Sequence, residues 1–101
     1  MRIIVMLDPP NTRGTKTAYS EFRKFLVSDG YIRIGVELYM RVVVNRNGAE
    51  KHLKRLEKYN PGTGTIRVFK MTEKQFSSMT FLTGTPNQQE QIVGANCHIV
   101  L

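Results

Sequence analysis

The feature that most constrains this chain is the apolar run near its start. Residues 2–8 read Arg-Ile-Ile-Val-Met-Leu-Asp, and two prolines follow at positions 9 and 10. Proline lacks the backbone N–H that a sheet ladder needs, so the pair predicts that a short strand ends there. Because consecutive rather than alternating positions are apolar, we expect both faces of this strand to be covered in the folded protein.

The segments that follow alternate between helical and strand periodicity. After Thr15 the apolar residues recur at the spacing of an amphipathic helix, and Asp29-Gly30 predicts where that helix ends. Residues 31–34 and 36–44 are expected to be strands, the second with period-two alternation. Residues 49–59 are again amphipathic, so a second helix is expected there.

The last third of the chain is expected to hold shorter elements. Residues 65–71 predict a strand, and Thr72 is expected to cap one short helical turn. Residues 81–83 are expected to be extended, and residues 97–101 to form a terminal apolar strand. The order of elements is then β-α-β-β-α-β with additional strands, which is the ferredoxin-like α+β arrangement with both helices on one face of the sheet.

Two helices on one face leave the other face of such a sheet uncovered. Since the first strand is apolar on both sides, a second copy of the chain is the economical cover, and we expect a homodimer joined through its sheet faces. The ferredoxin-like domain is expected to span residues 1–84. Residues 85–101 are expected to be a C-terminal extension whose terminal strand pairs with the other protomer.

Composition excludes several classes of protein. The 101 residues suit one domain, and no apolar run approaches the roughly 20 residues of a membrane span, so we expect no membrane partner. The single cysteine, Cys97, excludes an internal disulfide framework and a multi-cysteine zinc site. A reducing, cytoplasmic location is therefore expected.

The charge is positive and unevenly placed. All 15 basic residues and 7 of the 8 acids lie within positions 1–74, and the net charge of the chain is +7. Such a basic body indicates a polyanionic partner, most often nucleic acid, although a role in solubility explains the charge equally well. The basic residues gather on the outer faces of the two expected helices, at Lys16, Arg23 and Lys24 and at Lys51, Lys54, Arg55 and Lys58.

Asp8 is the first candidate for chemistry. It ends the first strand and is the only acid in the first twenty residues. An aspartate before proline commonly hydrogen-bonds its own backbone, and that structural interpretation stays open. If Asp8 lies near a dimer axis instead, two carboxylates would face each other and could share Mg²⁺, which needs only one or two protein carboxylates.

Other candidates are weaker. His52 falls on the apolar stripe of the second helix, which favours a packed histidine over a ligand. Tyr31 and Tyr39 lie on expected strands, where core packing and stacking on bases are both open. Neighbouring Cys97 and His98 would point to opposite faces of a strand, which is poor geometry for one metal ion.

Several segments, in order, resemble the CRISPR-associated protein 2 family, and most closely its type II form. They are residues 1–9, 19–26, 29–31, 39–41, 49–56, 67–68 and 72–76. The resemblance as a whole covers roughly residues 1–84. It implies a homodimer of ferredoxin-like protomers in a prokaryotic cytoplasm. It also implies that Asp8 of each chain lies at the interface, as a ligand for Mg²⁺ or Mn²⁺ and as the residue on which nuclease activity depends.

The resemblance places further residues near this site. Arg33 and Tyr39 fall where the family often has an arginine and an aromatic residue, and Glu37 stands where the family usually has a serine. Glu37 could add a ligand if its strand borders the dimer axis. The residues expected to contact nucleic acid are Arg13, Lys16, Arg33, Lys51, Lys54, Arg55 and Lys58.

Three functions compete at this point. The first is a double-stranded-DNA-binding scaffold that bridges dimers of the CRISPR integrase subunit during spacer acquisition. The second is a metal-dependent endonuclease, acting on RNA or DNA, that uses Asp8 paired across the dimer. The third is a generic ferredoxin-like binding domain. Hydrolysis by two metal ions about 4 Å apart normally draws on several ligands, and only one acid per chain lies at the expected place, which favours the scaffold.

Overall fold

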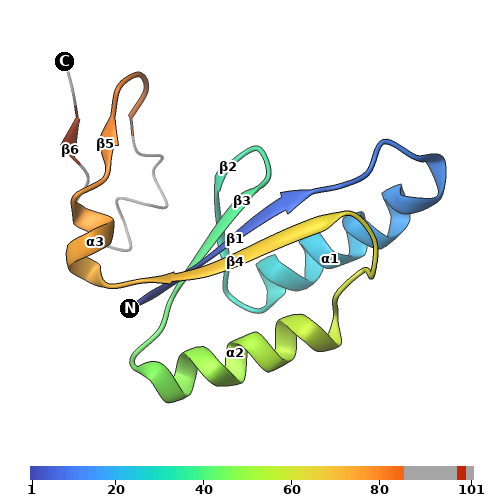
Figure 1. Ribbon diagram of the computed structural model, residues 1–101, viewed down its shortest axis with the longest axis horizontal. Coiled ribbons are helices and arrows are strands. Elements are labelled where there is room, and N and C mark those ends of the chain that lie inside the picture. The colour runs from blue at the N-terminus through green and yellow to red at the C-terminus, as the bar shows by residue number, and fades with distance from the viewer. Residues whose placement is uncertain (86–97, 100–101) are drawn as a thin grey trace.

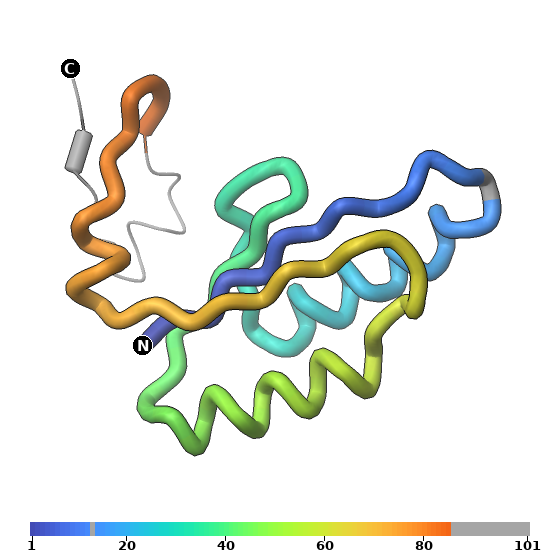
Figure 2. The backbone as a smooth tube through the Cα atoms, in the orientation of Figure 1, coloured from blue at the N-terminus to red at the C-terminus, as the bar shows by residue number. Residues whose placement is uncertain are grey.

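The computed structural model describes residues 1–85 and 98–99 (Figures 1 and 2). Its elements are β1 (Arg2–Asp8), the 3-10 helix η1 (Arg13–Thr15), α1 (Lys16–Ser28), β2 (Ile32–Gly35), β3 (Leu38–Val42), α2 (Arg46–Lys58), β4 (Thr65–Met71), α3 (Glu73–Ser77), β5 (Thr80–Phe81) and β6 (His98–Ile99). None of the described helices has the length and apolar character that crossing a membrane requires.

The main sheet has four antiparallel strands in the order β2-β3-β1-β4. Helices α1 and α2 lie side by side on one face of it (Figure 1). This confirms the expected α+β, ferredoxin-like architecture. β1 lies in an interior position of the sheet, between β3 and β4.

Most element boundaries agree with the expected ones, and the start of α2 is the clearest difference. The sequence pattern predicts this helix from residue 49, but it begins at Arg46 because Asn45 caps it: the Asn45 side chain accepts a 2.9 Å hydrogen bond from the Gly48 backbone N–H. The short helix α3 follows the prediction, since the Thr72 hydroxyl and the Gln75 side chain form a reciprocal capping box.

The face of the sheet under α1 and α2, here the covered face, holds the main core. Ile3, Val5 and Leu7 of β1 point into it and are 4% exposed or less. Phe22 and Leu26 of α1 pack against them, together with other residues of the two helices. Removal of this much apolar surface from water is the principal driving force for the fold.

The opposite face, here the open face, carries the alternate positions of the same strands. Strand register places these residues on it: Arg2, Ile4, Met6, Asp8, Leu38, Met40, Val42, Thr65, Arg67, Phe69 and Met71. Ile4 and Met40 are buried there by Phe76 of α3, so part of this face is covered by the same chain. At this end of the sheet, near the N-terminus (Figure 1), α3 of the same chain supplies part of the cover that the sequence assigned to a second copy. Cover of the rest of the face by a second copy stays a prediction.

Arg2 attaches α3 to the sheet. Its guanidinium is 2% exposed and donates to the Glu73 carboxylate at 2.9–3.1 Å, and it lies 4.0 Å from the centre of the Phe76 ring. The buried charge is thereby paired within the chain, which offsets the cost of removing it from water. On the same face, Met6, Val42 and Phe69 remain 38–46% exposed.

The described part of the C-terminal extension forms a small second sheet. β6 pairs in parallel with β5 of the same chain, Thr80 opposite His98 and Phe81 opposite Ile99. Pairing of the terminal strand with another protomer stays a prediction. Cys97 and the rest of the extension, residues 86–97 and 100–101, lie outside the described residues.

Candidate functional site

Asp8 lies at the last position of β1, at the end of the open face opposite to α3 (Figure 1). Its register partner is Thr65 of β4, and Pro9 follows it. The residue is exposed, and its carboxylate forms no hydrogen bond or ion pair with any described residue. The hydrogen bond from the backbone that an aspartate before proline commonly accepts is therefore not formed among the described residues, and the carboxylate stays available to a ligand.

The loop before β4 packs tightly beneath the end of β1. Gly64 has φ +71°, and a Cβ placed on it would lie 2.8 Å from the Asp8 carbonyl oxygen and 2.6 Å from Pro10 Cδ. Only glycine fits this approach without displacement. The Tyr19 hydroxyl donates to the Thr63 carbonyl at 2.5 Å, and burial, followed by the nearby Asp8 charge, raises the pKa of Tyr19.

Glu37 reaches the same end of the sheet but turns toward α1. Its carboxylate accepts from Arg23 at 2.6 and 3.2 Å, while its backbone carbonyl accepts from the Leu7 N–H at 2.9 Å. A carboxylate held in a two-point ion pair with arginine is a poor metal ligand. The structure therefore brings Glu37 close to β1 without adding its carboxylate to that of Asp8.

A divalent cation would have one carboxylate per chain at this place. Among the described residues, no three histidine, cysteine or acidic side chains gather as a metal site would require. Mg²⁺ keeps most of its waters and is held by one or two carboxylates, so a pair of Asp8 side chains from two chains fits its chemistry.

Arg33 and Tyr39 lie on the other face of the sheet from Asp8. They are register partners on β2 and β3, and Tyr39 is 3% exposed within the main core. The hypothesis that Tyr39 stacks on bases is wrong, because its ring is buried against the helices. Arg33 is exposed and donates to the carbonyls of Gly35 and Val36 at 2.7–3.1 Å, so its guanidinium braces the β2–β3 turn.

The basic residues of α2 separate into two groups. Lys51, Lys54 and Lys58 are exposed, and none of them forms an ion pair with another described residue. Arg55 instead binds the buried carboxylate of Asp29, the cap residue of α1, so this guanidinium serves the contact between the two helices. Arg55 thus differs from the three lysines in being paired within the chain, and its contact with nucleic acid stays a prediction.

The remaining predicted contacts lie at the start of α1. Lys16 is exposed and forms no ion pair in the described part of the chain, at the first position of that helix. The backbone of Arg13 belongs to η1, while its side chain lies outside what the structure describes.

A buried polar cluster links α1, α2, β2 and β3. The four buried polar atoms without a hydrogen-bond partner in the described residues all belong to it: Asp29 Oδ2, Tyr31 Oη, Arg41 Nε and His52 Nδ1. Burial, and then the Asp29 charge, raises the pKa of Tyr31 to about 12. Burial, and then the Arg41 charge, lowers the pKa of His52, whose Nδ1 lies 3.6 Å from Asp29. His52 is therefore a packed residue, in agreement with the interpretation favoured above.

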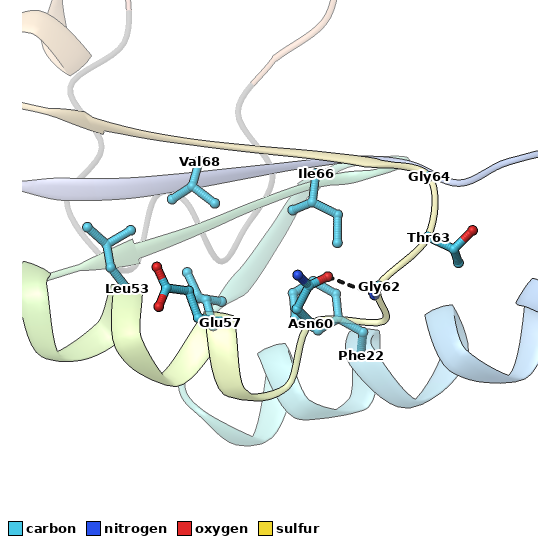
Figure 3. Close-up of a pocket in the computed structure, with 10 residues that line it drawn as sticks. Phe22, Leu53, Glu57, Asn60, Gly62, Thr63, Gly64, Ile66 and Val68 are labelled. Atoms are coloured by element: carbon cyan, nitrogen blue, oxygen red, sulfur yellow. Dashed lines mark hydrogen bonds between the residues drawn. The ribbon is translucent and has the colours of Figure 1, made fainter.

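A cavity of about 510 Å³ lies between α2 and β4 (Figure 3). Phe22, Leu53 and Ile66 form part of its apolar wall, and Glu57 is its only ionisable side chain among the described residues. A catalytic pocket usually combines an apolar wall with several convergent ionisable groups, so this cavity does not have the composition of an active site.

One residue on the open face was missed by the sequence reasoning. Arg67 of β4 is the register partner of Met6, so it is a diagonal neighbour of Asp8 on the same face. It is exposed and forms no ion pair with any described residue. The alternation of residues 65–71 contained this signal, but only the pairing of β4 with β1 puts Arg67 beside Asp8.

Comparison with known proteins identifies relatives. Residues 1–79 match the family model described as CRISPR associated protein Cas2. The chain is 42% identical to a "CRISPR-associated endoribonuclease Cas2" of Acidovorax ebreus over 94% of each chain. It is 39% identical to proteins of the same name from Ligilactobacillus salivarius and Streptococcus mutans, over 83% of this chain and 84% and 78% of theirs.

Proposed function

The chain belongs to the CRISPR-associated protein Cas2 family, and we propose that it acts in prokaryotic spacer acquisition as a homodimer that binds double-stranded DNA. In this role it bridges dimers of the integrase subunit, which carries out the chemistry. The observation that carries the proposal is the row of exposed lysines on α2, Lys51, Lys54 and Lys58, which form no ion pair with any described residue.

Spacing and charge suit these lysines for contact with phosphates. They lie three and four positions apart, so they share one face of the helix. Lysines that neutralise phosphates release condensed counterions, which gives binding that is independent of sequence and strongly weakened by salt. A scaffold that accepts foreign DNA of any sequence requires this kind of contact.

The test is the salt dependence of duplex binding. We expect replacement of Lys51, Lys54 and Lys58 by alanine to weaken binding of all duplex sequences alike. The slope of log affinity against log salt should also fall by about 0.9 for each phosphate that the variant no longer neutralises. Lys70→Ala is the matched control, because Lys70 already pairs with Glu50 at 3.4 Å. An unchanged slope in the triple variant would remove these lysines from the DNA interface.

A metal-dependent endonuclease is the second candidate. The names of the relatives favour it. The carboxylate of Asp8 on the open face also favours it, because it forms no ion pair with any described residue. In a dimer joined through that face, the two Asp8 carboxylates would hold Mg²⁺ or Mn²⁺. A bound ion of this kind lowers the pKa of its water and stabilises the developing charge on phosphate.

Asp8→Asn separates the two candidates. For the endonuclease, metal-dependent cleavage of RNA or DNA by the purified protein should disappear in this variant and persist in Glu21→Gln, a change at an exposed residue of α1. For the scaffold, integration together with the partner subunit should continue in Asp8→Asn. Cleavage that survives the substitution would count against Asp8 as the catalytic residue.

A further inference from the structure

The open face carries three charged residues on β1, β3 and β4, and only one of them is paired within the described part of the chain. Arg2 is buried against Glu73 beneath α3. Asp8 and Arg67 lie beyond α3, exposed and without an ion pair among the described residues. Exposed Met6 and Phe69 lie on the same face, opposite Arg67 and Ile4 in the strand register.

Burial of this face in a homodimer would leave both charges in a region of low dielectric constant. Removing a charge from water without a partner is costly, so each must be neutralised across or within the interface. A two-fold axis makes residue i of one chain contact residue j of the other, and j contact i. A face that holds one acid and one base close together is therefore complementary to its own copy.

We propose that Arg67 of one protomer pairs with Asp8 of its partner, so that the proposed dimer contains two such ion pairs. This inference rests on the proposed homodimer and adds the residue that neutralises its acidic pair. The planar guanidinium can bind a carboxylate through two parallel hydrogen bonds, which a lysine at this position would not do. The two negative charges of Asp8 are then balanced by two positive charges, so the dimer forms without a divalent cation.

Charge exchange between two variants tests the pairing. Asp8→Arg would oppose arginine to arginine in its own homodimer, and Arg67→Asp would oppose aspartate to aspartate. We expect each variant alone to dimerise at least about 100-fold more weakly than the wild type, measured by sedimentation in the presence of EDTA. In an equimolar mixture both contacts become arginine opposite aspartate, and dimerisation should return to within about tenfold of the wild type.

The mixture distinguishes this pairing from its alternatives. If Asp8 and Arg67 paired within one chain, each variant would keep its own repulsion and mixing would restore nothing, which would overturn the inference while a wild-type dimer remained. A wild type that stays monomeric at tens of micromolar would instead overturn the proposed dimer itself. A wild-type dimer that requires Mg²⁺ would also overturn the inference, because the metal would then neutralise Asp8.

Two further variants guard against loss of folding. Lys70→Asp changes the same strand on the covered face, and it should leave dimerisation unchanged. Arg67→Gln should weaken the dimer at least about tenfold, and Asp8→Asn in the same chain should recover part of that loss, because no buried charge is then left unpaired. Circular dichroism shows whether each variant is folded, and absence of recovery in a folded double variant contradicts the pairing.

Discussion

The two faces of the sheet differ in how many of their charged side chains are paired within the chain. On the covered side, the prominent ion pairs close within the chain: Arg55 binds Asp29, Arg23 binds Glu37, and Lys70 reaches Glu50. On the open face, only Arg2 has a partner among the described residues, Glu73 beneath α3. The covered face thus neutralises its charges within a single chain, while the open face leaves the charges of Asp8 and Arg67 and part of its apolar surface exposed.

The largest expected difference between the two faces is in core stability. Leu26 of α1 is 0% exposed, whereas Phe69 of β4 is 42% exposed. Leu26→Ala should lower the free energy of unfolding by about 3–5 kcal/mol. Phe69→Ala should lower it by less than about 1.5 kcal/mol, because part of the ring is already in water.

Urea denaturation at a concentration where the wild type is monomeric makes this measurement. Equal losses for Leu26→Ala and Phe69→Ala would contradict the distinction between the faces. The second variant should have its main effect at higher concentration, on self-association measured by sedimentation.

A smaller effect is expected at the ion pair between Arg2 and Glu73, the one such pair in the described part of the open face. Hydrogen bonds from Arg2, stronger than the opposing effect of partial burial, lower the pKa of Glu73. Glu73→Gln leaves Arg2 buried without a counter-charge and should cost about 1–2 kcal/mol, a modest value because the Glu73 side chain is 55% exposed.

The pH dependence of this loss has a defined direction. Since the folded state holds the pKa of Glu73 below its ordinary value of 4.5, the stabilisation is present above that pH and disappears as the pH falls through the lowered pKa. Between neutral pH and acid, the stability of the wild type should therefore approach that of Glu73→Gln. A constant difference between the two proteins throughout this range would contradict the assigned pairing, and Glu21→Gln is the exposed control.

The smallest expected effect concerns the covered face. The Tyr31 hydroxyl is buried without a hydrogen-bond partner among the described residues, so Tyr31→Phe should change stability by less than about 1 kcal/mol and in the stabilising direction. Tyr19→Phe is the matched comparison, because it removes the hydrogen bond to Thr63 and should cost about 1 kcal/mol. A loss above about 1.5 kcal/mol in Tyr31→Phe, measured by urea denaturation, would indicate that this hydroxyl has a partner.

Much of the fold could be predicted from local patterns. The strand at Thr65–Met71 and the capping box at Thr72 follow from alternation and from short-range side-chain chemistry, and both are confirmed. The coverage of the open face by Phe76 could not be predicted in this way. The packing of Phe76 on Ile4 and the accompanying ion pair between Arg2 and Glu73 join residues about 71 positions apart, and periodicity contains no information on such distant contacts.

The candidate site could be predicted only in part. The place of Asp8 at the end of β1 follows from the sequence, because a strand followed by two prolines must end there. The partners of Glu37 and Arg55 could not be foreseen, since each is bound by a residue of another element, Arg23 and Asp29 respectively. Arg67 was missed for the same reason, because its proximity to Asp8 exists only after β4 has paired with β1.

The close approach of Gly64 to the end of β1 offers a way to move Asp8 without changing its charge. Any side chain at position 64 would collide with the Tyr19 hydroxyl, the ring of Pro10 and the Asp8 carbonyl oxygen. Gly64→Ala would therefore shift the carboxylate while preserving every titratable group of the chain. An assay of assembly or cleavage on this variant would therefore show whether the position of the Asp8 carboxylate matters, and not only its presence.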